Sequence, residues 1–226
     1  PTVMPQDTMQ YGCVDFCVSG WGSQSLLELT ISLLSGTPSI EKIPGLSDRS
    51  GDAVKIASTN DTCEDVHWRD LPYHLIEPTL ERYFEIQEER VFPIYTAFGC
   101  PYKCTFCMSP IWYKGVRKKW SPINAGDVVD HIQHLKEEYD IDFVYIVDDD
   151  TFVNTKHFGG ISQLLKDRGV KVGIGVRGIR INEVLKLKPE LLELMQEVGV
   201  TNLHIGVETG SQRMLDLMKK EITVEQ

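Results

Sequence analysis

The sequence predicts an α/β protein whose C-terminal part is built from parallel strand–helix units. Short apolar runs alternate there with stretches of helical periodicity, and the loops between them are short. Chemically active side chains follow every strand, at the end where ligands sit in parallel α/β folds. They are a group of cysteines after the first strand, Asp148–Asp150 after the second, Arg177 after the third and Glu208 after the fourth. This pattern fits either an open sheet or a barrel.

The N-terminal segment is expected to carry one strand, one helix and a hairpin. Residues 11–18 are typical of a short buried strand. The helix that follows has an apolar stripe at i, i+4 and i+7, and this stripe is formed by Leu27, Ile31 and Leu34. Gly36 is expected to end the helix, and residues 43–57 are expected to form a hairpin.

The segment 61–90 is irregular and rich in proline and aromatic residues, so we expect a linker with a short helix near 77–85. Beyond it the elements become regular. Strands are expected at 92–98, 142–147, 170–176 and 201–207. Helices are expected at 124–139, 155–168 and 189–198, and a last one begins near Ser211. A closed parallel barrel needs more than these four units, so we expect a fragment of a longer protein.

Composition limits the class of protein and its partners. The 226 residues are 42% hydrophobic and 25% charged, which is ordinary for a globular protein. No apolar run approaches the roughly 18–20 residues of a transmembrane segment and no signal pattern is present, so we expect a cytoplasmic protein. The net charge of −10 opposes binding to nucleic acid. The basic run Lys114–Lys119 is either a solvated loop or a contact for an anionic substrate or cofactor tail.

Three of the six cysteines lie within eight residues, in the sequence Cys100-Pro-Tyr-Lys-Cys104-Thr-Phe-Cys107. This crowding favours metal chemistry in a reducing compartment over a disulfide framework. Three thiolates on a tight loop bind three irons of a cubane cluster and leave the fourth iron open. The alternative is a zinc site, which needs a fourth ligand. The candidates for that ligand are Cys63, His131 and His134.

The cysteine motif, with Phe106 before its last cysteine, resembles the signature of the radical S-adenosylmethionine (SAM) superfamily. One branch of this family carries an N-terminal cobalamin-binding domain. Its second and fourth strand ends are similar to VYIVDDDTFVNTKHF (residues 144–158) and LHIGVETGSQRMLDLMKK (residues 203–220). The last strand, loop and helix of its cobalamin-binding domain resemble VDFCVSGWGSQSLLELTISLLSG (residues 14–36), although the branch more often has an acidic residue at Gln24.

The resemblance implies both a fold and a domain order. Residues 91–226 would form the N-terminal part of a parallel (β/α) radical SAM barrel, truncated after its fourth unit. A linker at 61–90 would precede it. Residues 1–60 would be the C-terminal remnant of a Rossmann-like cobalamin-binding domain.

The resemblance also implies roles for individual residues. Cys100, Cys104 and Cys107 would hold a [4Fe–4S] cluster. The residues expected around SAM are Phe106 for the adenine, Asp149 and Asp150 for the ammonium, Arg177 for the carboxylate and Glu208 for the ribose. Arg180 competes with Arg177 for the carboxylate, and one of the aspartates is expected to cap the next helix. Phe106 has the alternative of a core residue.

Cobalamin is the third cofactor that the resemblance implies. Gly20 and Gly22 allow a close approach of the backbone to a cofactor tail, or they are simply turn glycines. No D-x-H-x-x-G motif for a cobalt-ligating histidine occurs in the chain.

The leading function that the resemblance implies is reductive cleavage of SAM to a 5′-deoxyadenosyl radical by a cobalamin-dependent methyltransferase that acts on an unactivated carbon. The substrate would be a small molecule or peptide, and the electron donor a flavodoxin or ferredoxin. A cobalamin-free cyclase, oxidoreductase or methylthiotransferase is the alternative, and a non-catalytic, metal-stapled binding module is the third. No side chain is assigned as a catalytic acid, base or nucleophile.

Overall fold

The computed structural model describes residues 4–50, 53–58, 67–112 and 119–226. The chain divides into two compact units, one formed mainly by residues 1–66 and the other mainly by residues 67–226. The domain boundaries expected after residues 60 and 90 stay predictions.

In its described residues, the first unit is a small antiparallel sheet accompanied by two α-helices. Its elements are α1 (Pro5–Met9), β1 (Phe16–Val18), α2 (Ser23–Ser35), the 3-10 helix η1 (Ile40–Lys42), β2 (Leu46–Ser50) and β3 (Ala53–Lys55). The sheet has the order β1-β2-β3, with β2 antiparallel to both neighbours, which confirms the expected hairpin. The expected strand 11–18 is shorter than predicted, because Tyr11 and the residues after it form a turn in which Val14 N donates to Tyr11 O at 3.0 Å.

Helix α2 forms where the sequence predicts it, but it buries a different face. Leu27 and Leu34 of the expected stripe are 53% and 84% exposed. The buried face of α2 is formed by Ser25, Leu29 and Ser32. Ser25 Oγ donates to Pro44 O at 2.7 Å, so a small polar residue lets the helix approach the segment before β2. The helix ends at Gly36, in the left-handed region at φ 77°, as expected.

The second unit holds most of the regular structure. Its elements are η2 (Trp68–Asp70), η3 (Tyr73–Leu75), α3 (Glu77–Gln87), β4 (Val91–Ile94), β5 (Ala97–Phe98), α4 (Ser109–Trp112), β6 (Ser121–Pro122), α5 (Ala125–Tyr139), β7 (Phe143–Ile146), η4 (Thr151–Asn154), α6 (Thr155–Asp167), β8 (Gly173–Arg180), α7 (Ile181–Val184), α8 (Pro189–Glu197), β9 (Val200–Gly206) and α9 (Gln212–Leu217). The expected strand 92–98 is divided between β4 and β5.

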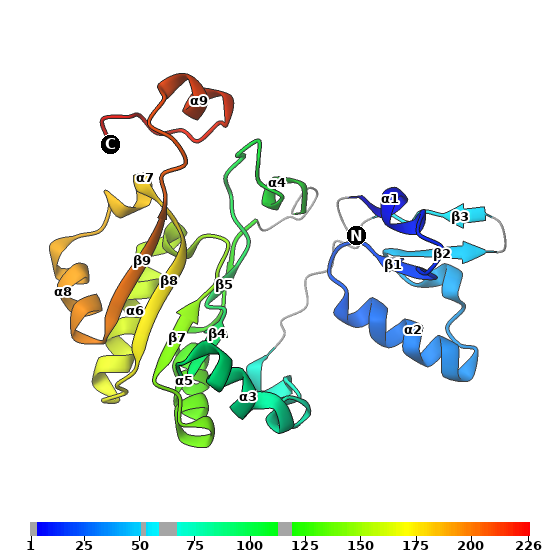
Figure 1. The fold of residues 1–226 in the computed structure, drawn as a ribbon, viewed down its shortest axis with the longest axis horizontal. Coiled ribbons are helices and arrows are strands. Elements are labelled where there is room, and N and C mark those ends of the chain that lie inside the picture. Colours follow the sequence, from blue (N-terminus) through cyan, green and yellow to red (C-terminus); the bar gives the residue numbers. More distant parts are fainter. Residues whose placement is uncertain (1–3, 51–52, 59–66, 113–118) are drawn as a thin grey trace. The chain divides into compact units, whose positions relative to one another are not determined.

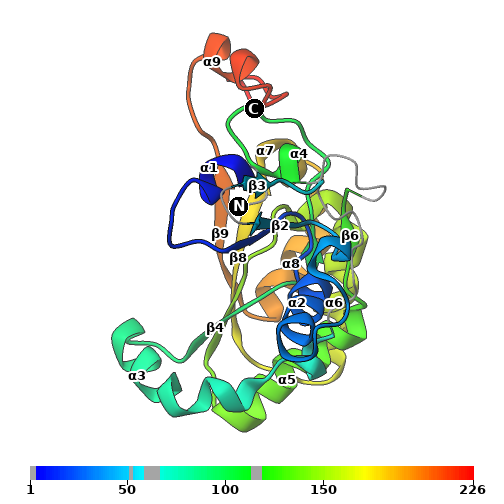
Figure 2. The same cartoon turned by 90° about the vertical axis from the view of Figure 1, so that its right-hand side faces the viewer.

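A parallel four-stranded sheet organises this unit. Its strands lie side by side in chain order, β4-β7-β8-β9, and helices α5, α6 and α8 cover one face (Figures 1 and 2). Parallel strands added one after another in the same direction, with all the crossover helices on one side, are the arrangement of a (β/α) barrel. The sheet therefore confirms the expected α/β class and the partial barrel.

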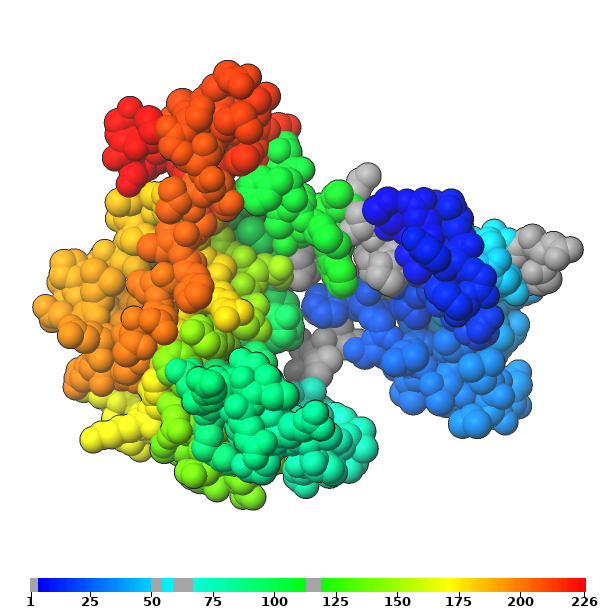
Figure 3. All heavy atoms as spheres, viewed as in Figure 1, coloured from blue at the N-terminus to red at the C-terminus, as the bar shows by residue number. Residues whose placement is uncertain are grey.

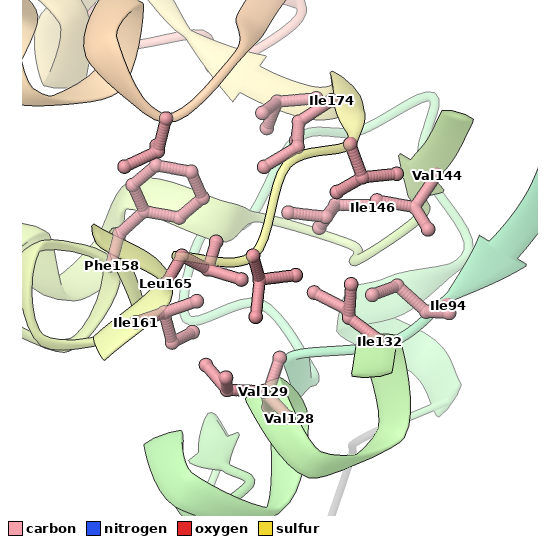
Figure 4. Close-up of a cluster of buried hydrophobic side chains, with 14 of the residues drawn as sticks. Ile94, Val128, Val129, Ile132, Val144, Ile146, Phe158, Ile161, Leu165 and Ile174 are labelled. Atoms are coloured by element: carbon pink, nitrogen blue, oxygen red, sulfur yellow. The ribbon is translucent and has the colours of Figure 1, made fainter. Parts of the chain in front are cut away.

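The core lies between the sheet and its helices (Figure 4). Val144, Ile146 and Ile174 point from β7 and β8 toward α5 and α6, and each is at most 1% exposed. The stripe of α5 meets them as the sequence predicts, because Ile132 and Leu135 are completely buried. This packing fixes the strands, so it also fixes the loops at their carboxyl ends.

Candidate functional site

The cysteine loop lies between β5 and α4, at the carboxyl end of the first strand of the sheet. All three cysteines of the motif are free thiols; Cys104 is buried, and Cys100 and Cys107 are partly buried. Burial raises the pKa of the Cys100 thiol to about 12. This thiol therefore keeps its proton at neutral pH unless a metal ion displaces it.

Each thiol has a different neighbour. Cys100 Sγ lies 3.9 Å from Asp150 Oδ2, and Cys107 Sγ lies 3.4 Å from the hydroxyl and the backbone N–H of Ser109. Arg180 Nη1 donates to Cys104 Sγ at 2.9 Å. Within the part of the chain that the structure describes, no three His, Cys, Asp or Glu side chains are gathered as ligands of a single metal ion.

The number of thiols suits a cluster better than a single zinc ion. Zinc takes four ligands in a structural site. A cubane can be held by three cysteines, each on a different iron, with the fourth iron left open. Three free thiols on one loop are thus a donor set that fits a [4Fe–4S] cluster. The histidines weighed as zinc ligands pack elsewhere, since His131 and His134 stack against Trp68, and Cys63 lies outside the described residues.

The three aspartates after β7 have three different environments. Asp148 accepts from the backbone N–H and the hydroxyl of Thr96, and burial raises its pKa to about 6. Asp149 accepts from Gly99 N at 3.0 Å and from Ser109 Oγ at 3.1 Å, so it braces both ends of the cysteine loop. Asp150 is 1% exposed and lies beside Cys100.

Asp150 is the aspartate that the fold leaves ready for a ligand. Its Oδ1 atom and the Oε2 atom of Glu183 are buried without a hydrogen-bond partner among the described residues. Burial and the neighbouring Glu183 carboxyl raise the pKa of Asp150 well above its ordinary value. The raised pKa means that this carboxyl pair holds a proton, and a cationic ligand group would take the place of that proton.

The structure separates the two arginines that competed for one role. Arg177 is exposed and its Cζ atom lies 4.4 Å above the centroid of the Tyr145 ring. Arg180 is buried and contacts the cysteine loop. Between them Gly178, at φ 68°, forms a bulge that interrupts the pairing of β8 with β9. The structure therefore brings Arg180, and not Arg177, to the cysteines.

Tyr102, inside the cysteine motif, connects the loop to α7. Its hydroxyl donates to Glu183 Oε1 at 2.8 Å and accepts from Asn182 Nδ2 at 3.4 Å. Burial and the hydrogen bond to the Glu183 carboxylate raise the pKa of Tyr102. Neither Tyr102 nor Glu183 was expected at the site, because each looks like an ordinary polar residue of a loop or short helix in the sequence.

Glu208 lies at the end of β9 as expected, and it has an ionic partner that the sequence does not suggest. Lys220 Nζ lies 2.7 Å from Glu208 Oε1, and Lys220 is only 4% exposed. The same ammonium lies 5.6 Å from the centroid of the Phe106 ring. Phe106 is 53% exposed, so the alternative of a core residue is wrong.

The segment after α9 also holds the cysteine loop in place. Thr105 N donates to Met218 O at 3.0 Å and Thr105 Oγ1 donates to Leu217 O at 3.1 Å. Figure 3 shows the two segments, in green and orange-red, packed against each other. These hydrogen bonds join Cys104 and Phe106 to the neighbourhood of Glu208.

Two expected features are not among the residues described for this site. Gly20 and Gly22 belong to the first unit, where Gly20 has φ 93° and Gly22 precedes α2. Their role toward cobalamin stays a prediction. Of the basic run Lys114–Lys119, only Lys119 is among the described residues.

Gly178 offers a test of how the site is shaped. A Cβ atom at this position would overlap Asp148 O, whereas one at Gly169, at φ 64°, would meet nothing within 4 Å. Gly169→Ala is expected to cost only the strain of a left-handed residue, about 1–2 kcal/mol. We expect Gly178→Ala to cost clearly more and to lower the iron content after reconstitution. Denaturant unfolding and iron analysis measure both effects; equal unfolding free energies for the two variants would contradict the close contact.

The fold and the site define a class of protein: a parallel α/β half-barrel that presents three free cysteines at the carboxyl edge of its sheet. The chain belongs to the radical SAM superfamily, because the family model matches residues 94–226, more than half of the chain. Members of this superfamily use a [4Fe–4S] cluster and SAM, which confirms the family and the two cofactors that the cysteine motif predicts.

Relatives within this family catalyse different reactions. The chain is 31% identical to cytidylyl-2-hydroxyethylphosphonate methyltransferase from Streptomyces wedmorensis, over 65% of this chain and 28% of the relative. It is 26% identical to anaerobic magnesium-protoporphyrin IX monomethyl ester cyclase from Rubrivivax gelatinosus, over 98% of this chain and 39% of the relative. The chain therefore spans well under half of the length of either protein.

A solved structure supports the fold of the whole chain. The cobalamin-dependent SAM radical enzyme OxsB, with aqua-cobalamin and SAM bound, has a TM-score of 0.73 and 20% sequence identity, over 100% of this chain and 32% of OxsB. This likeness covers both units, and it confirms the fold class expected from the sequence. Among the described residues, no helix is both long and apolar enough to cross a membrane.

Proposed function

We propose that this chain holds the cluster and SAM of a cobalamin-dependent radical SAM methyltransferase. The observation that carries the proposal is the meeting of the cysteine loop with side chains from the other strand ends. Asp150 approaches Cys100, Arg180 donates to Cys104, and Lys220 links Phe106 to Glu208. The loop thus carries an aromatic ring and has a carboxyl and a cationic neighbour, which together match the groups of SAM.

In this proposal Cys100, Cys104 and Cys107 hold the [4Fe–4S] cluster. When bound, the cluster supplies the electron that cleaves the S–C5′ bond of SAM to give methionine and a 5′-deoxyadenosyl radical. The unsatisfied Oδ1 of Asp150 accepts from the SAM ammonium. Asp149 braces the loop instead, since its oxygens bind Gly99 and Ser109.

The other SAM contacts follow from the positions of the side chains. Glu208, held by Lys220, accepts from the ribose hydroxyls, and the exposed face of Phe106 lies against the adenine. Arg180 is better placed than Arg177 for the carboxylate, because it is the arginine that reaches the cysteine loop. Arg177 is then available to a substrate.

Methyl transfer with cobalamin rests on the relatives and on the first unit. A methyltransferase is among the relatives, and the structure of OxsB contains cobalamin. In this proposal, residues 1–60 are the end of the cobalamin-binding domain and approach the cofactor at Gly20 and Gly22. Residues 61–90 are the linker to the barrel at 91–226, and a flavodoxin or ferredoxin supplies electrons in the cytoplasm.

The second candidate is a radical SAM cyclase without methyl transfer, which the relationship to the anaerobic ester cyclase favours. Anaerobic purification of the whole protein separates the candidates. Retained cobalamin together with 5′-deoxyadenosine formation supports the methyltransferase. Formation of 5′-deoxyadenosine without cobalamin supports the cyclase class, and absence of both leaves only a metal-stapled binding module.

A further inference from the structure

Arg180 is held in an unusually fixed position beside one cysteine of the motif. It is 6% exposed, and each of its three guanidinium nitrogens has a hydrogen-bond acceptor. Nη1 donates to Cys104 Sγ at 2.9 Å, Nε donates to Asn182 Oδ1 at 3.3 Å and Nη2 donates to Lys220 O. The Cζ atom lies 3.8 Å above the centroid of the Tyr102 ring.

The charge of this guanidinium has no carboxylate in direct contact. Among the described residues, no Asp or Glu forms an ion pair with Arg180, although its charge acts on Asp150. On the surface, by contrast, Arg69 pairs with two carboxylates, and Arg90 and Arg168 pair with one each. The atoms that accept from Arg180 are a sulfur, an amide oxygen and a backbone oxygen. Cys104 Sγ is therefore the acceptor that becomes anionic when it binds iron.

A fixed cation bonded to a cluster thiolate changes the energy of the cluster. The oxidised [4Fe–4S] core carries two positive charges, so three thiolates give it a net charge of −1, and one-electron reduction makes this −2. The buried guanidinium stabilises the more negative state, and its hydrogen bond withdraws electron density from the sulfur. Both effects raise the reduction potential, and burial makes them stronger than in water.

We propose that Arg180 is a positioning residue that raises the reduction potential of the cluster through its hydrogen bond to Cys104. This inference rests on the proposed function, because it requires the cluster to assemble on the three cysteines. It is separate from any contact of Arg180 with SAM, since the effect on the potential exists before SAM binds. A purely packing role for Arg180 would leave the potential unchanged.

The test is a redox titration of the reconstituted protein without SAM. The EPR signal of the reduced cluster is recorded at each potential. We expect Arg180→Gln to move the midpoint potential to a more negative value. Arg180→Lys keeps the positive charge but loses the planar guanidinium group. The midpoint potential of its cluster should therefore lie between those of the wild type and Arg180→Gln. Arg168→Gln is the control, because it removes an equal charge whose partner is Asp130. A wild-type potential in Arg180→Gln would overturn the inference.

A second measurement detects the hydrogen bond in the wild-type protein. In wild-type protein labelled with ¹⁵N-guanidino arginine, the reduced cluster should show a hyperfine coupling to a guanidinium nitrogen by pulsed EPR. The coupling should disappear in Arg180→Lys, and this loss would assign it to the Arg180 guanidinium. A cluster without any such coupling overturns the inference and leaves the proposed function intact. A wild-type protein that assembles no cluster overturns both.

Discussion

Replacing Cys104 by alanine will abolish assembly of the iron–sulfur cluster. Cys104 is the middle ligand of the motif and is 7% exposed, in a loop whose backbone is tied to the segment after α9. Without this thiolate one iron of the cubane loses its protein ligand, and Arg180 loses its acceptor. Wild-type protein reconstituted under anaerobic conditions should contain about four irons per chain, and Cys104→Ala close to none.

The matched control is Cys17→Ala. Cys17 is 4% exposed and equally free of a disulfide, but it lies on β1 in the first unit. This variant should assemble the cluster like the wild type. Iron and acid-labile sulfide are measured in parallel for all three proteins. Full iron content in Cys104→Ala would remove this cysteine from the ligand set.

Replacing Glu208 by alanine will weaken SAM binding and leave the cluster assembled. The Glu208 carboxylate lies at the end of β9, held by Lys220, and it is expected to bind the ribose and not iron. Hydrogen bonds to a charged group contribute about 1.5–3 kcal/mol, so the Kd of SAM should rise roughly ten- to a hundred-fold. Equilibrium dialysis at matched cluster content measures the change.

Two further variants separate binding from folding. Glu208→Ala leaves the buried Lys220 ammonium without its partner, so Glu208→Gln is needed as a variant that keeps a hydrogen-bond acceptor. It should bind SAM better than Glu208→Ala. Glu197→Ala is the surface control. Glu197 lies on α8, and its carboxylate pairs with Lys166 on α6. An unchanged Kd in Glu208→Ala would place the ribose elsewhere.

Much of the second unit could be predicted because its sequence signals are local. Alternating apolar runs and helical stripes indicate parallel strand–helix units, and the stripe of α5 buries Ile132 and Leu135 as expected. The carboxyl ends of parallel strands meet at one edge. Residues as far apart as Cys104 and Glu208 could therefore be assigned to one site from the order of the elements alone.

The choice between Arg177 and Arg180 could not be made from the sequence. In a regular strand, the side-chain period of two places residues 177 and 180 on opposite faces, but it does not tell which of them reaches the cysteine loop. The bulge between Val176 and Ile179, with Gly178 at φ 68°, changes the direction of the side chains at the end of β8. Arg180 reaches the cysteines, and Arg177 lies over the Tyr145 ring. Nothing local in the sequence marks a bulge there, apart from the glycine itself.

Other errors arise where no periodic signal exists or where several compete. Helix α2 has apolar residues on every side, so the stripe of Leu27 and Leu34 did not identify the buried face that Leu29 occupies. Lys220 pairs with Glu208 across a turn and a short helix, a separation without a characteristic spacing. Such contacts depend on how the chain returns to the sheet, which tertiary packing decides.

Three cysteines are proposed to hold a cluster whose remaining iron is open to SAM. The most direct measurement is the EPR spectrum of the reduced, reconstituted protein before and after addition of SAM. We expect a [4Fe–4S]⁺ signal, with about four irons and four sulfides per chain, that changes when SAM binds at the open iron. Stoichiometric zinc without iron–sulfur absorption, or a cluster signal that SAM leaves unaltered, would contradict the claim.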